Sequence, residues 1–203
     1  YFLFATLQDQ LDFVRFPLGN FLKSEIRNMA DDYQLTVSDK PDSQDICFVT
    51  SDSYRDLINK IQPEINKEGN IFDHNGNKIG THKGISNYTI GQRKGIGIGG
   101  QNQPLYVKEV NKNQNYIVLA PIDQLQKNKI FFKDINWLIE NNINQEIKCS
   151  AKIRSTQKEL SGKLFVNSNN GYFLFDEMVS ATSPGQACVF YKNDQVLGGG
   201  WIV

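Results

Sequence analysis

The feature that most constrains this chain is a series of short strand-like runs that fills its second half. From about Gln103 to Val203, apolar and polar residues alternate in short runs separated by turn residues such as Asn, Asp and Gly. Side chains of a strand point alternately to its two faces, so this pattern predicts half-buried strands. Regular spacing of such strands is typical of a small closed barrel or a sandwich. The predicted strands are 105–107 and 116–119, forming a hairpin, and 130–135, 146–154, 159–166, 171–176, 186–192 and 195–202.

The first hundred residues have a different pattern. Ile26, Met29, Ala30 and Tyr33 follow helical spacing, which predicts a helix over 23–34. A hairpin is predicted over 69–80, where the pair Asn-Gly at 75–76 suits a type I′ turn with positive φ at both positions.

Composition excludes several classes of protein. The chain has 203 residues, 39% of them apolar, which is enough for one or two packed domains. Lys plus Arg and Asp plus Glu each number 22, so the formal net charge is zero and any nucleic-acid contact must come from a local patch. No apolar run approaches the roughly 18 residues of a membrane helix, and no leader peptide is visible. We therefore expect no membrane partner and a cytoplasmic protein.

Three cysteines, an odd number without paired spacing, argue against a disulfide framework and fit a reducing compartment. Cys47 stands where a polar, turn-prone run enters an apolar strand, so it could be a half-exposed nucleophile. Asp42 and Asp45 would oppose its ionisation and Lys40 would favour it. Taken alone, this pattern favours a small buried hydrophobe over a nucleophile. Cys188 lies in a run that is apolar on both faces, so we expect it in the core.

Cys149 belongs to a strand with clean alternation. Ile147, Cys149, Ala151 and Ile153 face one side, which places Cys149 in the core. The opposite side carries three cations, Lys148, Lys152 and Arg154. Two residues along a strand span roughly 7 Å, close to the separation of adjacent phosphates on a nucleic-acid strand, so phosphate contact is one interpretation. A solvated face whose lysines protect a sheet edge is the other.

The glycine-rich stretch at 91–100 is the most unusual motif. Glycines bracket Gln92, Arg93 and Lys94, so backbone N–H groups and cations could approach a phosphate closely. It matches neither a Walker loop nor a Rossmann fingerprint, and a solvated connector explains it equally well. His74 and His82 are the only histidines and lack zinc spacing, so we expect no metal site.

Several strings together resemble one family, the bacterial tRNA-specific 2-thiouridylases (MnmA), and they occur in that family's order over essentially the whole chain. DSQDICF with YTIGQRKG is the strong part of the resemblance. The strings are YFLF at Tyr1, FPLG at Phe16, KSEIRNMA at Lys23, KPDSQDICFV at Lys40, GTHKG at Gly80, YTIGQRKGIGIGG at Tyr88, PLYV at Pro104, SPGQACVFY at Ser183 and LGGGWI at Leu197.

The resemblance implies a function. Enzymes of this family replace the C2 oxygen of the wobble uridine in certain tRNAs with sulfur, using ATP to adenylate that oxygen and a cysteine persulfide to deliver sulfur. The cysteine of the DSQDICF motif, here Cys47, holds the persulfide and can form a disulfide with an upstream nucleophilic cysteine. This reading overrides the core assignment of Cys47. A persulfide sulfur donor protein and tRNA are the implied partners, and we expect a monomer.

The resemblance also implies tRNA contacts and a domain plan. An Arg-aromatic pair of the family corresponds to Arg154 and Ser155, where Ser replaces the usual Tyr, and the Gln of the family's PGQ turn corresponds to Gln186. The expected fold is α+β: residues 1–50 end an α/β adenylating domain, 51–102 form a small central tRNA-contacting domain, and 103–203 form a C-terminal antiparallel β-barrel.

The ATP-binding loop and the nucleophilic cysteine of the family have no counterpart in this sequence. We therefore expect ATP to bind upstream of Tyr1, in a longer protein of which this chain is a fragment that is inactive alone. A non-catalytic RNA-binding β-barrel module, in which Cys47 is structural, is the alternative. A protein-interaction domain without an RNA role is a third possibility.

Overall fold

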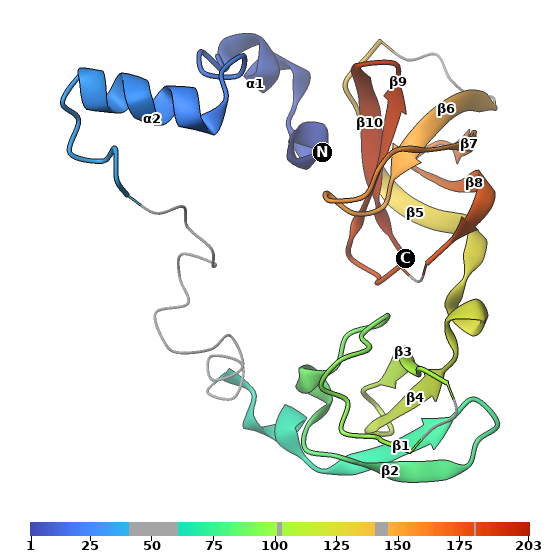
Figure 1. Ribbon diagram of the computed structural model, residues 1–203. Coiled ribbons are helices and arrows are strands. Elements are labelled where there is room, and N and C mark those ends of the chain that lie inside the picture. The colour runs from blue at the N-terminus through green and yellow to red at the C-terminus, as the bar shows by residue number, and fades with distance from the viewer. Residues whose placement is uncertain (41–60, 101–102, 141–145, 181) are drawn as a thin grey trace.

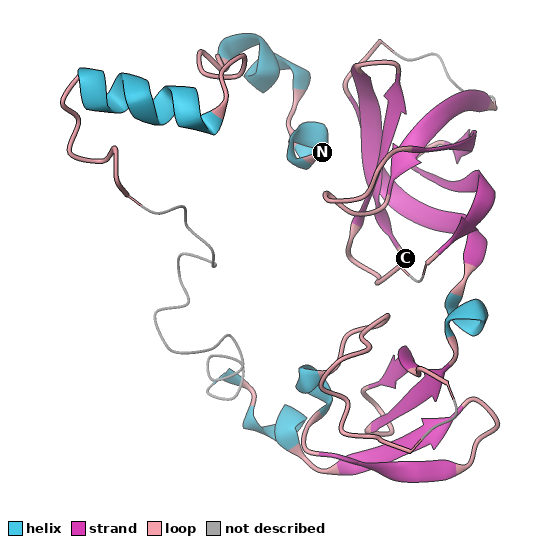
Figure 2. Ribbon diagram, viewed as in Figure 1, coloured by secondary structure: helices cyan, strands magenta, loops and turns pink. Residues whose placement is uncertain are grey.

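The computed structural model describes residues 1–40, 61–100, 103–140, 146–180 and 182–203. Its strands form two units, a four-stranded sheet and a closed six-stranded barrel, and short helices precede them (Figure 1). Helices occur in the N-terminal segment and as short turns between strands (Figure 2). The predicted α+β class is confirmed. Within these residues, no helix has the length and apolarity needed to cross a membrane.

The helical elements are η1 (Phe2–Ala5), α1 (Gln8–Phe13), α2 (Lys23–Asp32), η2 (Pro63–Asn66), η3 (Ile85–Asn87) and η4 (Ile122–Leu125). The strands of the sheet are β1 (Gly69–Asp73), β2 (Lys78–His82), β3 (Tyr106–Asn111) and β4 (Tyr116–Ala120). The strands of the barrel are β5 (Lys127–Trp137), β6 (Ile147–Lys152), β7 (Leu160–Asn167), β8 (Asn170–Val179), β9 (Ala187–Lys192) and β10 (Gln195–Ile202).

The barrel closes in the order β10-β5-β8-β7-β6-β9, with each neighbouring pair antiparallel. All six strands predicted for this region form. Closure pairs every strand on both sides, so the barrel has no open sheet edge. Phe132, Phe173 and Phe190 are almost completely buried inside it, and the ring centroids of Phe132 and Phe190 lie 5.0 Å apart. The alternation read from the sequence therefore specifies the interior of the barrel.

The hairpin of β3 and β4 belongs to the other sheet, whose order is β2-β1-β4-β3. Its predicted place in the C-terminal barrel is wrong. Strand β4 pairs in parallel with β1, with Ile117 opposite Ile71, and both side chains are fully buried in one core. Alternation determines which face of β4 is buried but not which strand lies beside it, so the pattern alone could not distinguish the two sheets.

The turn between β1 and β2 differs from the predicted type I′ turn. Only Gly76 has a positive φ, 88°, and Asn75 does not. The Asp73 carboxylate accepts hydrogen bonds from the backbone N–H groups of Asn75 (2.9 Å) and Asn77 (2.8 Å). Its pKa is lowered, chiefly by a further bond from the Asn77 side chain. An aspartate at the start of the turn thus replaces the expected backbone geometry with a side-chain cap, and residues 74–77 form the loop between the two strands.

Helix α2 begins at Lys23, as predicted, and ends at Asp32 because Gln34 adopts a φ of 54°. The Glu25 carboxylate accepts a hydrogen bond from the Leu22 N–H at its start (2.6 Å). Neither α1 nor α2 buries a side chain. Residues 1–37 instead expose many large apolar side chains, namely Phe2, Leu3, Leu7, Phe13, Val14, Phe16, Leu18, Phe21, Leu22, Tyr33, Leu35 and Val37.

The short helix η1 packs on the outside of the barrel. Phe4 is 4% exposed and meets Trp201 of β10 edge-on, with ring centroids 5.0 Å apart. A Cβ added at Gly199 would lie 2.6 Å from the Phe4 ring, so glycine is required there for this contact. The Asn136 side-chain amide donates to the carbonyls of Phe4 (2.7 Å) and Thr6 (2.9 Å). The first residues of the chain are therefore bound to the barrel wall.

Candidate functional site

The predicted persulfide carrier, Cys47, lies in the stretch 41–60, outside the described residues. Its role therefore stays a prediction. The two cysteines that the structure does describe, Cys149 and Cys188, are both free thiols. The disulfide that the resemblance implies would involve Cys47, so neither of these thiols tests it.

Cys149 and Cys188 have environments that suppress thiol chemistry. Cys188 is fully buried in the barrel core, and Cys149 packs against the same core from β6. Burial raises the pKa of Cys149 to about 12 and raises that of Cys188 further still. Since the thiolate is the nucleophile, both side chains are protonated and unreactive at neutral pH. Their predicted role as core residues is consistent with this environment.

Arg154 and Ser155 lie in a turn that follows β6. Ile153 is buried in the barrel interior, which fixes the point where the chain leaves the wall. The Gln157 N–H then donates to the Arg154 carbonyl (3.2 Å) and closes the turn. Arg154, Ser155 and Thr156 are exposed at its tip. The exposed side chains at this tip are therefore one guanidinium and two hydroxyls.

The strip of three cations expected along β6 is interrupted in the structure. Lys152 lies 3.8 Å from the Glu159 carboxylate, and its Nζ stands 5.3 Å from the centroid of the Tyr191 ring. Strand β6 ends at Lys152, so Arg154 belongs to the following turn and not to the strand face. A carboxylate thus offsets the middle charge, and a row of phosphate contacts along this face is disfavoured.

Gln186 ends a tight turn that precedes β9. Its backbone N–H donates to the Ser183 carbonyl (3.2 Å), and Gly185 between them has a φ of 86°. Pro184 followed by a glycine of positive φ fits a type II turn. The Gln186 carbonyl accepts a hydrogen bond from the Ile202 N–H (2.7 Å), which fixes this turn to the last strand of the barrel. The sequence Ser-Pro-Gly-Gln therefore sets the position of the glutamine.

The register of β6 and β9 brings these two turns together. Ser150 pairs with Tyr191 and Lys152 with Val189. The chain that leaves β6 toward Arg154 therefore runs alongside the chain that enters β9 from Gln186. The structure thus places the three predicted tRNA-contacting residues of the barrel, Arg154, Ser155 and Gln186, at one barrel end.

Two further polar residues belong to this end of the barrel, and sequence reasoning missed them. The side-chain oxygens of Gln157, Ser183 and Gln186 are buried and have no hydrogen-bond partner among the described residues. Buried acceptors are normally satisfied, so each of these oxygens marks a place for an ordered water, or for a ligand group once the side chain turns outward. We call Arg154, Ser155, Gln157, Ser183 and Gln186 the barrel-end site. A hollow of about 240 Å³ beside it is lined by Ile153, Arg154, Thr156, Gln157 and Ser180.

One cation beside several hydrogen-bond acceptors suits a nucleic-acid chain. A guanidinium can bind a phosphate, and amide oxygens accept hydrogen bonds from ribose hydroxyls and base N–H groups. The barrel-end site holds no activated nucleophile, so it can bind a substrate but cannot by itself transfer sulfur. Elsewhere among the described residues, no three His, Cys, Asp or Glu side chains gather as metal ligands would.

ATP does not fit the described part of the N-terminal segment. The hollow there is lined by Thr6, Asp9, Gln10, Phe13 and Val14, which include a carboxylate and no cation. A triphosphate needs cations or a cradle of backbone N–H groups. No step involving ATP is therefore assigned to this hollow.

Comparison with known proteins gives three family matches in order along the chain. Residues 1–51 match the family described as the tRNA methyl transferase HUP domain. Residues 55–121 match the tRNA methyl transferase PRC-barrel domain, and residues 127–202 match the aminomethyltransferase beta-barrel domain. The last two ranges follow the division into sheet and barrel seen in the structure, since β4 ends at Ala120 and β5 begins at Lys127.

Similar proteins carry one name. The chain is 46% identical over 204 residues to the tRNA-specific 2-thiouridylase MnmA of Ehrlichia ruminantium (strain Gardel), an alignment that covers 100% of this chain and 55% of that protein. It is 46% identical over 207 residues to the MnmA of Rickettsia canadensis (strain McKiel), with the same coverage. It is also 46% identical to that of Wolbachia sp. subsp. Drosophila simulans (strain wRi), of which it covers 54%. The chain thus spans about half the length of these relatives, and the ordered domain matches together with this identity show that it belongs to the tRNA-specific 2-thiouridylase (MnmA) family.

Proposed function

We infer that this chain is the tRNA-gripping and sulfur-carrying part of a tRNA 2-thiouridylase that acts on the wobble uridine. Family membership over the full chain is the observation that carries this proposal. The barrel-end site supports it independently, because it combines a guanidinium with unsatisfied hydrogen-bond acceptors. That combination suits the backbone and riboses of an RNA.

In this proposal Cys47 carries the sulfur as a persulfide, whose terminal sulfur attacks C2 of the adenylated uridine and displaces AMP. The upstream cysteine of the longer protein then attacks the Cys47 sulfur as a thiolate, which releases thiouridine and leaves a disulfide to be reduced. Cys149 and Cys188 are unsuitable carriers, because burial keeps their thiols protonated. A persulfide is more acidic than a thiol, so it stays ionised more readily beside Asp42 and Asp45. Loading of Cys47 requires a donor protein that itself carries a persulfide, and sulfur then moves by thiolate attack on a sulfur–sulfur bond.

Activation of the uridine oxygen by ATP is assigned to the longer protein, since the hollow in the described part of the N-terminal segment offers no cation for a triphosphate. We accordingly propose that the chain alone makes no thiouridine. Its separate contribution is to hold the tRNA while Cys47 presents the sulfur. We further propose that it acts in the cytoplasm as a monomer.

The test is a thiolation assay with a chimera. The residues of the Ehrlichia ruminantium relative that this chain does not cover are joined to the chain and supplied with ATP, tRNA and a persulfide donor. Thiouridine is then measured by mass spectrometry of digested tRNA. We expect product with the chimera, none with the chain alone, and none with the Cys47→Ser chimera, which should still bind tRNA with near-normal affinity.

Cys188→Ser serves as the matched control for loss of a sulfur atom. It should chiefly reduce stability, because it buries a hydroxyl, and it should keep the transfer activity at a temperature where the protein is folded. If the Cys47→Ser chimera produced normal amounts of thiouridine, Cys47 would be structural. The chain would then be the alternative, an RNA-binding β-barrel module without a catalytic role.

A further inference from the structure

The glycine-rich loop between β2 and β3 is held in a fixed conformation by Gln92. The Gln92 side-chain oxygen accepts a hydrogen bond from the Thr89 N–H (3.0 Å), and its side-chain nitrogen donates to the Lys94 carbonyl (3.0 Å). The backbone of Gly91 and Gln92 exchanges two hydrogen bonds with Val107 of β3, at 2.8 and 2.9 Å. Gln92 is thus occupied within the loop, and the next two side chains project from a rigid base.

Those two side chains are cations with no acidic partner in the described chain. Arg93 and Lys94 are both exposed. Each of the ion pairs found among the described residues lies in the barrel, between Lys133 and Asp134, Lys152 and Glu159, and Lys163 and Glu146. Two adjacent positive charges therefore stand in the loop, and no carboxylate of the described residues forms an ion pair with either of them.

The backbone that follows is equally available. The N–H groups of residues 93–100 donate no hydrogen bond to any described residue. Gly95 and Gly97 have φ values of 73° and 80°, whereas Ile96 and Ile98 between and after them have negative φ. Alternation in the sign of φ is required for successive N–H groups to converge on one side, as they do in anion-binding nests.

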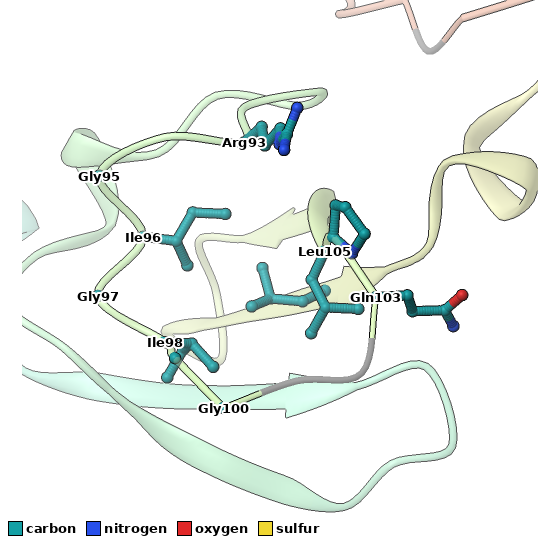
Figure 3. A pocket seen from close by; sticks show the side chains of 11 residues that line it. Arg93, Gly95, Ile96, Gly97, Ile98, Gly100, Gln103 and Leu105 are labelled. Carbon is teal, nitrogen blue, oxygen red and sulfur yellow. The ribbon is translucent and has the colours of Figure 1, made fainter.

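The loop also borders a hollow of about 550 Å³ (Figure 3). Arg93 lies at its rim, Ile96 points into it from the loop, and Leu105 lines the opposite side (Figure 3). Ile96 is 7% exposed, and Ile98 packs over Gly80 of β2, so the floor is apolar and firmly attached to the sheet. Cations at the rim and an apolar floor suit a phosphate joined to a less polar group.

Conformation alone does not explain every glycine here. Positive φ accounts for Gly95, Gly97 and Gly100. Gly99 has no such φ, and a Cβ built on it would meet none of the described residues within 4 Å. Its lack of a side chain keeps the hollow open without serving the packing of the described residues.

We propose that Arg93, Lys94 and the backbone N–H groups of Gly95–Gly97 form a second RNA site, which binds a phosphate of the RNA backbone while the attached ribose and base enter the hollow. This site rests on the proposed function and extends it to the four-stranded sheet. The Gln186 turn is bonded to Ile202 near the C-terminus, and in Figure 1 that end of the barrel faces the glycine-rich loop. One RNA could therefore contact both sites.

The test compares variants of the 203-residue chain in binding to a fluorescently labelled tRNA, measured by anisotropy over a range of salt concentrations. The double variant R93A/K94A should bind about tenfold more weakly, because it loses hydrogen bonds to a charged group, and its salt slope should fall by about one. The matched control K78A/K112A removes two exposed lysines of the same unit outside the hollow, and its affinity should change much less.

Gly99→Val provides an independent test. A Cβ at this position meets none of the described residues, so thermal unfolding followed by circular dichroism should be unchanged. Binding of tRNA should weaken, because Gly99 lines the hollow and the valine takes up space beside it. The proposal is overturned if R93A/K94A keeps the wild-type affinity and slope, or loses only what K78A/K112A loses. It is equally overturned if R93A/K94A loses ATP binding while tRNA affinity stays unchanged, because the anion would then be a free nucleotide.

If Arg154→Ala weakens binding and R93A/K94A does not, this proposal fails and the proposed function stands. If the wild-type chain binds no tRNA, both fail.

Discussion

The phenolic oxygen of Tyr1 donates a hydrogen bond to the carbonyl of Ala187, at 3.0 Å, and so joins the first residue of the chain to the strand that follows the Gln186 turn. Burial between η1 and the barrel is the main cause that raises the pKa of Tyr1. Together with the contact between Phe4 and Trp201, this bond places the start of the HUP-like segment directly beside the barrel-end site.

Phe4→Ala should release η1 from the barrel. The substitution removes a ring that is only 4% exposed. Deletion of a buried phenyl group typically lowers the free energy of unfolding by about 3 kcal/mol. Trp201, 41% exposed in the packed state, should become more exposed, so its fluorescence should shift to longer wavelength. Phe2→Ala, at a side chain that is 80% exposed, is the control and should leave the spectrum unchanged. An unaltered spectrum for Phe4→Ala would contradict the docking.

Alkylation should distinguish the three thiols. Only thiolates react at an appreciable rate, and burial raises the pKa of Cys149 to about 12. At about pH 8 the folded chain should therefore take up iodoacetamide at Cys47 and resist it at Cys149 and Cys188. Peptide mapping by mass spectrometry gives the site of each adduct, and the chain in guanidinium should be modified at all three. Equal rates at Cys47 and Cys149 in the folded chain would be incompatible with this assignment.

Stability should fall at mildly acidic pH because of His82. This side chain is 1% exposed, its Nδ1 accepts a hydrogen bond from the Gly84 N–H (3.2 Å), and burial lowers its pKa below the ordinary 6.5. The unfolded chain takes up a proton near pH 6.5 that the folded chain still refuses. The contribution of His82 to the free energy of unfolding is therefore at its maximum above that pH, and it decreases as the pH falls toward the lower pKa of the folded state.

The measurement is urea unfolding at about pH 7.5 and about pH 5. The His82→Gln variant should lose less stability between these values than the wild type does. His74→Gln removes the other imidazole, from an exposed turn, and should leave the wild-type pH dependence intact. A His82→Gln variant that loses as much stability as the wild type would assign the effect to other groups.

Arg154→Ala should weaken tRNA binding and lower the magnitude of the salt slope by about one, as expected for loss of one phosphate contact. Lys148→Ala is a suitable control, since it removes an exposed cation on β6 that lies before the barrel-end turn. The readout is the plot of log Kd against log salt concentration. A parallel line at unchanged affinity would show that Arg154 does not meet the RNA.

Much of the fold follows from local pattern. Alternation predicts all six strands of the barrel, and helical spacing predicts α2 to within two residues of its end. Pairing is different, because the parallel contact of β1 with β4 joins residues that are far apart in sequence and leaves no local signal. The docking of Phe4 on the barrel likewise leaves no local signal in the sequence. Gly199 makes room for its ring, but an isolated glycine in a strand does not indicate what approaches it.

The candidate site was predictable only in part. Arg154, Ser155 and Gln186 were predicted from the resemblance to the family. Arg154 and Gln186 are 32 positions apart in sequence, but they flank two paired strands, so the register of β6 with β9 brings them to one end of the barrel. Gln157 and Ser183 were missed because their polar oxygens become significant only once burial removes other partners. The alternation of charged residues also gave one wrong interpretation, for Lys152. It placed this lysine in a row of phosphate contacts, whereas the nearby Glu159 carboxylate offsets its charge.

Docking of η1 on β10 joins the two ends of a long stretch of chain without a covalent cross-link. The stretch leaves the barrel after Thr6, forms the N-terminal helices and the four-stranded sheet, and returns to the barrel at Lys127, where β5 begins. It is therefore a noncovalent ring. Since the entropy cost of closing a loop grows only slowly with its length, a few contacts at η1 can keep such a ring shut. The short connection from Ala120 to Lys127 already keeps the sheet near the barrel, so the docked η1 adds a second attachment, which ties the N-terminal segment to the same barrel wall.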